Sequence, residues 1–194
     1  MRLNKISKSL CFSLIIGVMV IGFVIFIQKQ SISQSQKMGK SVFESDTYNY
    51  TVEYPSSWYF HNLGKKMDTL YISNVSPDQY YHGGILPAGG AEIFIKVALV
   101  PSSKQSLSEF ITEELKHTII LSKENVQVNG TEAIKIIYIW KVGRGSFYKN
   151  VVVYFSVNKK IYKILLSFRK GDSKESYFMH VFDSVISSFY LTGG

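Results

Sequence analysis

The side chains that most often carry out chemistry are few in this sequence and lie far apart. The four histidines are His61, His82, His117 and His180. Only His180 and Asp183 stand one helical turn apart, and both fall on the polar side of an expected helix. A protein metal site needs several converging ligands. We therefore expect this pair to be solvated, with no bound metal and no cofactor.

Nucleophile motifs are equally weak. The chain contains no Gly-x-Ser-x-Gly pattern, and its single cysteine, Cys11, lies in an apolar N-terminal run. The segment Gly143-Arg144-Gly145 could cradle an anion through its backbone, but it lies between two expected strands, where glycine commonly serves a hairpin turn. We expect a non-catalytic protein. The alternative is an enzyme, such as a hydrolase, whose site the sequence does not reveal.

One loop has the composition of a contact surface. Tyr80, Tyr81 and His82 stand together in a glycine- and proline-rich segment, residues 76–90. Adjacent aromatic side chains in a loop either pack against their own sheet or meet a partner. Both readings stay open, and we take these three residues, together with Arg144, as the candidate binding loop.

The N-terminal segment predicts a membrane anchor. Residues 10–27 carry no charge, and as a helix they would be about 27 Å long, close to the thickness of a bilayer's hydrocarbon core. Basic residues in 1–9 should keep that end in the cytoplasm and place the rest outside. The alternative is cleavage near Ser31-Ile32-Ser33 and secretion. Residues 28–41 read as a flexible linker and residues 42–191 as the folded domain.

The charge is mildly basic. Without Arg2, Lys5 and Lys8, the 22 basic residues fall to 19 against 14 acidic ones, a net charge of +5. The lysines are scattered and do not form a stripe among aromatic residues, so we expect no nucleic-acid partner. An anionic membrane surface or acidic envelope polymer fits this charge at least as well.

The folded segment alternates like a sheet protein. Three successive strands are expected at 132–140, 147–157 and 160–168, with a tight turn at Asn158-Lys159. The first is apolar on both faces, which predicts a sheet covered on both sides. Earlier strands are expected at 48–54, 58–63, 69–74 and 92–100.

Two amphipathic helices should provide the cover. Ser106 and Glu109 form a capping box before an apolar stripe, and Asp172 with Glu175 forms a second one. The stripe of the second helix has apolar residues at helical spacing: Phe178, Val181, Phe182, Val185, Ile186 and Phe189. The single cysteine allows no internal disulfide, so this core must hold the domain together.

Several segments together resemble one family. The stretch from Tyr50 to Trp58, the Leu86–Ala91 loop, Gly130–Ala133, Asn158–Ile164 and Phe182–Phe189 are similar, in order, to landmarks of PsbP-like proteins. The resemblance covers about residues 42–191. It implies an α+β fold, an α/β/α sandwich around a mostly antiparallel sheet, and a non-catalytic binding or assembly module. It does not imply photosynthesis.

These observations predict a single-pass membrane protein whose outer domain, itself monomeric, binds a protein partner in the cell envelope. A tethered enzyme and a small-ligand or metal carrier are the alternatives. An enzyme would hold a titratable cluster in a concave site, and a carrier would enclose an apolar cavity.

Overall fold

Three long antiparallel strands form the centre of the domain. The computed structural model describes residues 39–61, 70–80, 85–99, 106–142, 145–192, and within it β7 (Thr131–Val142), β8 (Ser146–Val157) and β9 (Lys160–Arg169) pair in succession. Asn158 and Lys159 both have positive φ (50° and 62°) in the turn between β8 and β9. The predicted meander is confirmed, with each strand one to three residues longer than expected.

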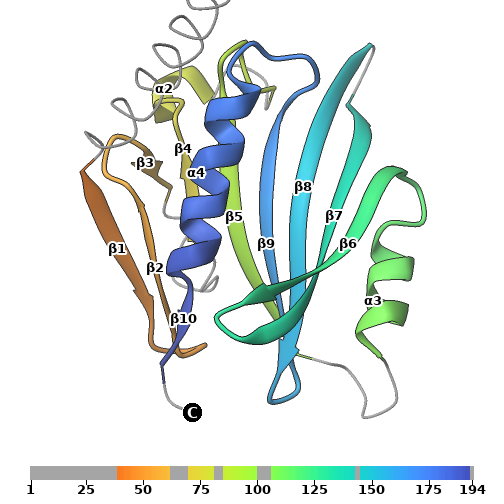
Figure 1. The fold of residues 1–194 in the computed structure, drawn as a ribbon. Coiled ribbons are helices and arrows are strands. Elements are labelled where there is room, and N and C mark those ends of the chain that lie inside the picture. The colour runs from red at the N-terminus through yellow and green to blue at the C-terminus, as the bar shows by residue number, and fades with distance from the viewer. Residues whose placement is uncertain (1–38, 62–69, 81–84, 100–105, 143–144, 193–194) are drawn as a thin grey trace, which may run out of the picture. The chain divides into compact units, whose positions relative to one another are not determined.

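The meander belongs to a seven-stranded sheet in the order β3-β4-β5-β9-β8-β7-β6, shown in Figure 1. Its other strands are β3 (Tyr59–Phe60), β4 (Leu70–Ser73), β5 (Ala91–Leu99) and β6 (Ile119–Val128). The sequence had not predicted β6. It pairs with β7 across Asn129-Gly130, whose φ values of 47° and 76° suit a two-residue hairpin turn that favours glycine.

The sequence had also not predicted a second, three-stranded sheet. It consists of β1 (Lys40–Ser45), β2 (Tyr50–Pro55) and β10 (Tyr190–Leu191), in the order β1-β2-β10. The strand β1 begins at Lys40, two residues before the expected start of the domain. Residues 62–69 lie outside the described ranges, so only β3 represents the strand expected at 58–63.

One helix covers each face of the large sheet. Along β8, Val152 and Tyr154 pack with α3 (Leu107–Glu114), whereas Phe168 of β9 contacts Phe178 of α4 (Glu175–Ser188) with ring centroids 5.4 Å apart. The strand register places Leu165 beside Val152 and Phe168 on the opposite face. The sandwich architecture follows, and Figure 1 shows α4 crossing in front of the sheet.

The two expected helix starts had different outcomes. Ser106 and Glu109 form the predicted capping box at α3. The prediction for Asp172 was wrong: α4 is preceded by Lys174 and has no side-chain cap. Asp172 instead accepts hydrogen bonds from the backbone N–H of Gly89, at 2.6 Å, and of Lys174, at 2.9 Å, so its carboxylate joins the loop before β5 to the start of α4.

A cluster of aromatic rings joins the two sheets. Phe189, just after α4, stacks on Tyr50 of β2 with centroids 5.1 Å apart. The same ring meets Phe155 of β8 edge-on at 5.3 Å and Tyr162 of β9 at 5.8 Å. All four side chains are buried. The small sheet therefore shares the core on the α4 side of the large sheet.

The N-terminal prediction lies outside the described residues, because residues 1–38 are not among them. None of the helices in the described ranges has the length and apolar character that a bilayer crossing requires.

Candidate functional site

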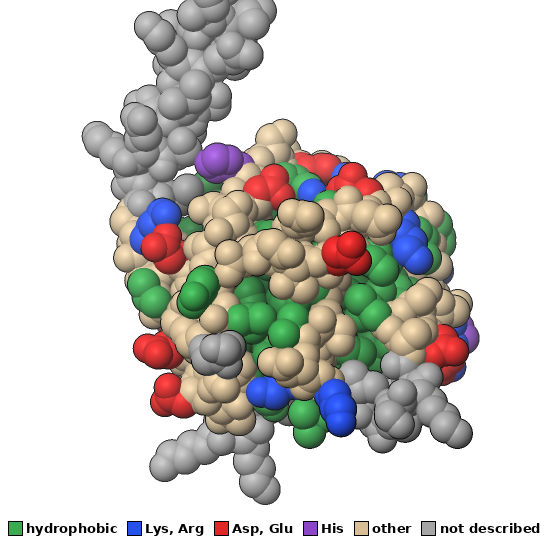
Figure 2. All heavy atoms as spheres, turned by 60° about the horizontal axis from the view of Figure 1, so that its bottom comes forward, with side chains coloured by type: hydrophobic (Ala, Val, Ile, Leu, Met, Phe, Trp, Pro, Cys, Tyr) green, Lys and Arg blue, Asp and Glu red, His purple; other side chains and the backbone are tan. Residues whose placement is uncertain are grey.

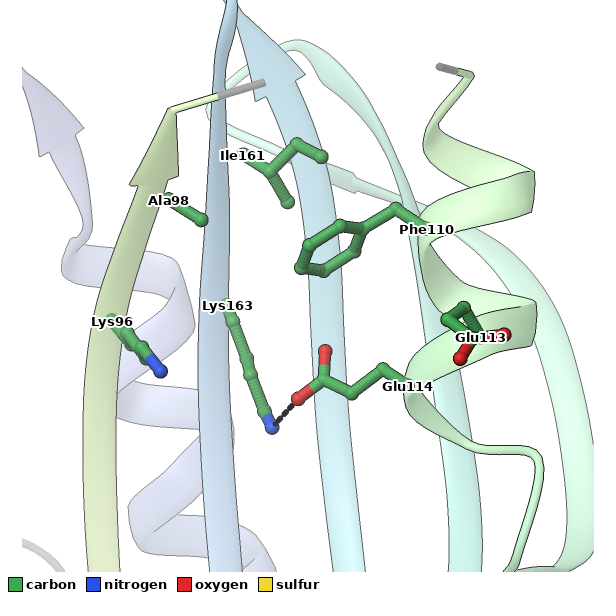
Figure 3. Close-up of a pocket in the computed structure, with 7 residues that line it drawn as sticks. All are labelled: Lys96, Ala98, Phe110, Glu113, Glu114, Ile161 and Lys163. Atoms are coloured by element: carbon green, nitrogen blue, oxygen red, sulfur yellow. Dashed lines mark hydrogen bonds and ion pairs between the residues drawn. The ribbon is translucent and has the colours of Figure 1, made fainter. Parts of the chain in front are cut away.

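A groove of about 420 Å³ lies between α3 and the paired strands β5 and β9 (Figure 3). Ala98 of β5 stands opposite Ile161 of β9, and Phe110 projects from α3 toward them. The full lining is Lys96, Ala98, Phe110, Glu113, Glu114, Ile161 and Lys163. One end of the groove is thus apolar and the other carries charged groups.

Two lysines face each other across the strand pair. Lys96 of β5 is the direct register partner of Lys163 of β9, so both side chains project from the same face of the sheet. Figure 3 shows them side by side in the groove. Like charges placed directly opposite each other destabilise a sheet unless other groups compensate them. This pair therefore needs negative charge nearby.

Among the residues that the structure describes, only Lys163 of this pair has a carboxylate partner. Glu114 of α3 forms an ion pair with Lys163 and accepts a hydrogen bond from the Tyr154 hydroxyl at 3.1 Å. The Lys163 ammonium also lies 5.8 Å from the centroid of the Tyr154 ring. Lys96 is exposed and forms no ion pair with any residue that the structure describes. Its charge remains available to a ligand.

Packing holds this arrangement in place. Ile111 and Leu115 bury the inner side of α3 against Ile136 and Tyr154. Phe110 meets the Tyr154 ring edge-on at 6.3 Å. The capping box of Ser106 and Glu109 fixes the N-terminal end of α3. The groove wall is consequently a rigid element, as a preformed binding site requires.

The groups in the groove suit binding better than proton transfer. Burial, reinforced by the charge of Glu114, raises the pKa of Tyr154, so its hydroxyl stays protonated and acts as a donor. The side chain of Glu113 is bound to Lys116, which lowers its pKa. An anionic group could sit beside Lys96 while an attached apolar group contacts Ala98 and Phe110, which are both half-buried.

The buried tyrosines beneath α3 predict a loss of stability in alkali. Burial, then the charge of Glu114, raises the pKa of Tyr138 from 10.0 to about 12. Because the folded-state pKa exceeds the unfolded one, the neutral phenol stabilises the fold fully below pH 10, and this contribution is lost as the pH rises through 12. Two pKa units correspond to about 2.7 kcal/mol. In urea melts between pH 9 and pH 12, Tyr138→Phe should therefore lose less free energy of unfolding than the wild type, by an amount of order 2–3 kcal/mol.

Tyr190→Phe, at an exposed tyrosine, is the control for this measurement. It should follow the wild type across the same pH range. The contrary result is a Tyr138→Phe curve of unfolding free energy against pH that runs parallel to those of the wild type and Tyr190→Phe. It would contradict the raised pKa of Tyr138 as a source of the alkaline loss of stability.

A second groove, of about 630 Å³, lies near the turn between β6 and β7. It is the larger of the two, but Glu132 is its only charged lining residue: the others are Leu107, Asn125, Val126, Gln127, Thr131, Ala133, Ile134 and Ser156. Its lining shows no comparable pairing of charges, so the α3 groove is the stronger candidate.

The candidate binding loop from the sequence remains a prediction. Tyr80 ends the short helix α2 (Pro77–Tyr80), which lies within the segment expected to be a loop. Tyr81, His82 and Arg144 fall outside the described residues. The groove residues were not singled out by sequence reasoning.

The histidines suggest no metal site in the described part of the chain. His61 stacks on Tyr71 at 4.6 Å, and burial lowers its pKa. Among the described residues, no group of three or more His, Cys, Asp or Glu side chains is placed to share a metal ion.

Comparison with known proteins settles the family. The family model described as PsbP-like protein matches residues 9–191. The chain belongs to the PsbP-like protein family. A comparison with curated proteins gives no match. The resemblance read from the sequence is therefore confirmed at the level of the family.

Solved structures share the PsbP-like fold at low identity. The cyanobacterial PsbP protein CyanoP from Synechocystis has a TM-score of 0.54 at 13% identity, covering 79% of this chain and 93% of CyanoP. A variant of Mog1 has a TM-score of 0.54 at 14% identity, covering 80% of this chain and 97% of the Mog1 chain. LpqN of Mycobacterium tuberculosis has a TM-score of 0.52 at 10% identity, covering 82% of this chain and 94% of the LpqN chain. At these identities the likeness concerns the fold.

Proposed function

We propose that this PsbP-like chain is a membrane-tethered, non-catalytic module outside the cytoplasm, which binds an acidic segment of a partner protein in the α3 groove. The observation that carries the proposal is the pair Lys96 and Lys163, of which only Lys163 has a carboxylate partner among the described residues. A carboxylate from a partner would complete the second ion pair. Hydrogen bonds and ion pairs to charged groups contribute more to recognition than neutral ones.

The apolar end of the groove adds selectivity. Ala98 and Phe110 are half-buried and expose apolar surface to the groove, whereas Ile161 is almost fully buried and adds little exposed surface. A partner residue next to the acidic one could place an aliphatic or aromatic side chain there. An acidic residue near an apolar residue is therefore the recognition pattern that the groove favours.

The charge distribution supports a local contact with an acidic segment. Figure 2 shows acidic and basic side chains dispersed over one face, with hydrophobic side chains gathered between them. Nucleic-acid binding would call for a continuous basic stripe. LpqN, which shares the fold, is involved in cell envelope biogenesis, and this is compatible with a partner in the envelope.

Zero-length crosslinking of carboxylates to amines tests the groove directly. In native membranes, we expect Lys96 of the full chain to become joined to an acidic residue of another protein, as mapped by mass spectrometry. Lys96→Glu removes the reacting amine, so binding by this variant is measured by co-purification of the partner, which the substituted carboxylate should repel and so prevent. The exposed Lys123→Glu, on β6, is the matched control and should leave co-purification unchanged.

The chain contains its own positive control for this reaction. Glu114 and Lys163 are already in contact and should crosslink within the molecule. Formation of that internal product without any product at Lys96 would refute the groove as the binding site.

The tether is tested separately by fractionation. Because residues 10–27 carry no charge, we expect the full-length chain to stay in the membrane fraction after alkaline carbonate and high-salt washes. Protease added from outside should digest the domain. A soluble chain whose N-terminus begins near Gln34 would overturn the tether in favour of cleavage and secretion.

A further inference from the structure

Five hydrophobic side chains are exposed together at one end of the large sheet. We call this set the apolar tip: Ile119, Ile120, Leu121, Trp140 and Phe147, with exposed fractions of 63%, 50%, 53%, 54% and 41%. They lie at the start of β6, near the end of β7 and near the start of β8. Because these strands are antiparallel neighbours, all three positions fall at the same end of the sheet.

The strand register shows that the tip wraps around a corner. Ile120 stands opposite Tyr138, so Trp140, two residues further along β7, is its diagonal neighbour on the same face, about 7–8 Å away. Ile119, opposite Ile139, points to the other face. Leu121 occupies a bulge on β6, an edge strand of the sheet. The apolar surface is consequently a protruding corner and not a flat face.

Two exposed lysines accompany this corner. Lys141 follows Trp140 in β7 and is the register partner of Phe147. The backbone N–H of Lys170 donates to the Phe147 carbonyl at 2.9 Å, which brings a second exposed lysine to the same end. Neither lysine forms an ion pair within the described ranges. The corner thus combines apolar side chains with uncompensated positive charge.

We propose that the apolar tip inserts into the interfacial region of an anionic lipid bilayer, with Lys141 and Lys170 at the level of the phosphate headgroups. Tryptophan favours this region because its ring is amphipathic, and lysine gains about 1 kcal/mol from an anionic surface. A protruding apolar corner with adjacent lysines suits a soft interface. A flat complementary protein surface would leave part of such a corner uncovered.

The proposal rests on the membrane tether of the proposed function. Residues 28–39 between the apolar run and β1 can span at most about 40 Å. A folded domain as long as residues 40–192 has a radius of gyration of about 15 Å. The tether would therefore keep every side of the domain within reach of the lipid surface, and the tip would select one orientation.

Trp140 provides a direct reporter. The chain has two tryptophans, and the other, Trp58, is only 4% exposed. With the full chain in nanodiscs that contain phosphatidylserine, we expect blue-shifted emission and quenching by brominated lipid. In phosphatidylcholine nanodiscs both effects should be much weaker. The Trp140→Phe variant, which retains buried Trp58, should show neither effect.

Charge reversal tests the electrostatic contribution. Lys141→Glu and Lys170→Glu should each lower the equilibrium constant for docking at least about fivefold. Lys159→Glu, at an exposed lysine in the turn at the opposite end of β8, should have little effect. Equal quenching in both lipid compositions, or none in either, would overturn the proposal.

Failure of the tether gives a different result. A chain that does not enter nanodiscs would refute the tether itself. Docking would then be measured by adding the same chain to preformed phosphatidylserine vesicles and following Trp140 emission. Unshifted, unquenched emission in that experiment would refute the tip as a membrane contact.

Discussion

Replacing Phe182 with alanine is expected to lower the free energy of unfolding by about 3–5 kcal/mol. Phe182 is completely buried, in the middle of the stripe that α4 packs into the core together with Phe178, Val181 and Val185. Truncation would leave a cavity where the ring now packs, because the surrounding side chains can relax only partly. The total free energy of unfolding of a typical domain is about 5–15 kcal/mol, so the loss would be a large fraction of that stability. Urea denaturation measures it.

His180, two residues earlier on the same helix, is the matched control. Its side chain is exposed, so His180→Ala should change the free energy of unfolding by less than about 0.5 kcal/mol. Met179, the residue before His180, is half-buried and is a poorer control. Equal effects at Phe182 and His180 would contradict the observed packing of α4.

The regular part of the fold could be predicted because it has a strong period. Helical spacing identified the buried positions of α4, and alternation with a tight turn identified β7, β8 and β9. The cap at Asp172 was mispredicted for a tertiary reason. Gly89, distant in sequence, donates its N–H to that carboxylate, which the residues around Asp172 could not reveal.

The strand β6 escaped prediction because it is an edge strand. Its residues from Ile119 to Asn125 are exposed on both faces, so they do not alternate between apolar and polar types. The signal that could have found it is Asn129-Gly130 before β7, a sequence typical of a two-residue hairpin turn. The small sheet was missed because β10 is only two residues long.

The α3 groove could not be predicted for a different reason. Lys96 and Lys163 each interrupt an apolar strand, where a lysine on the solvent side of a sheet is unremarkable. Their importance comes from the register that places them opposite each other and from Glu114, which reaches only one of them. Such a relation depends on tertiary pairing and leaves no local pattern in the sequence.

Phe189→Ala is expected to have a comparably large effect through the contact between the two sheets. Phe189 is 2% exposed and contacts Tyr50, Phe155 and Tyr162. Truncation should cost about 3–5 kcal/mol for the lost ring, and each lost aromatic pair can add about 0.5–1.5 kcal/mol. The neighbouring Tyr190→Ala, at a side chain 57% exposed, should cost less than about 0.5 kcal/mol.

Amide hydrogen exchange would show where the stability is lost. Since Phe189 joins β2 to β8 and β9, its removal should weaken the attachment of the small sheet more than the large sheet itself. Amides of β2 should then exchange faster through local opening, while those of β8 respond only to the change in global stability. A contrary result would be equal acceleration of amide exchange in β2 and β8, with a loss in the free energy of unfolding below about 1 kcal/mol. It would mean that the backbone pairing of β10 with β2 holds the small sheet without the aromatic cluster.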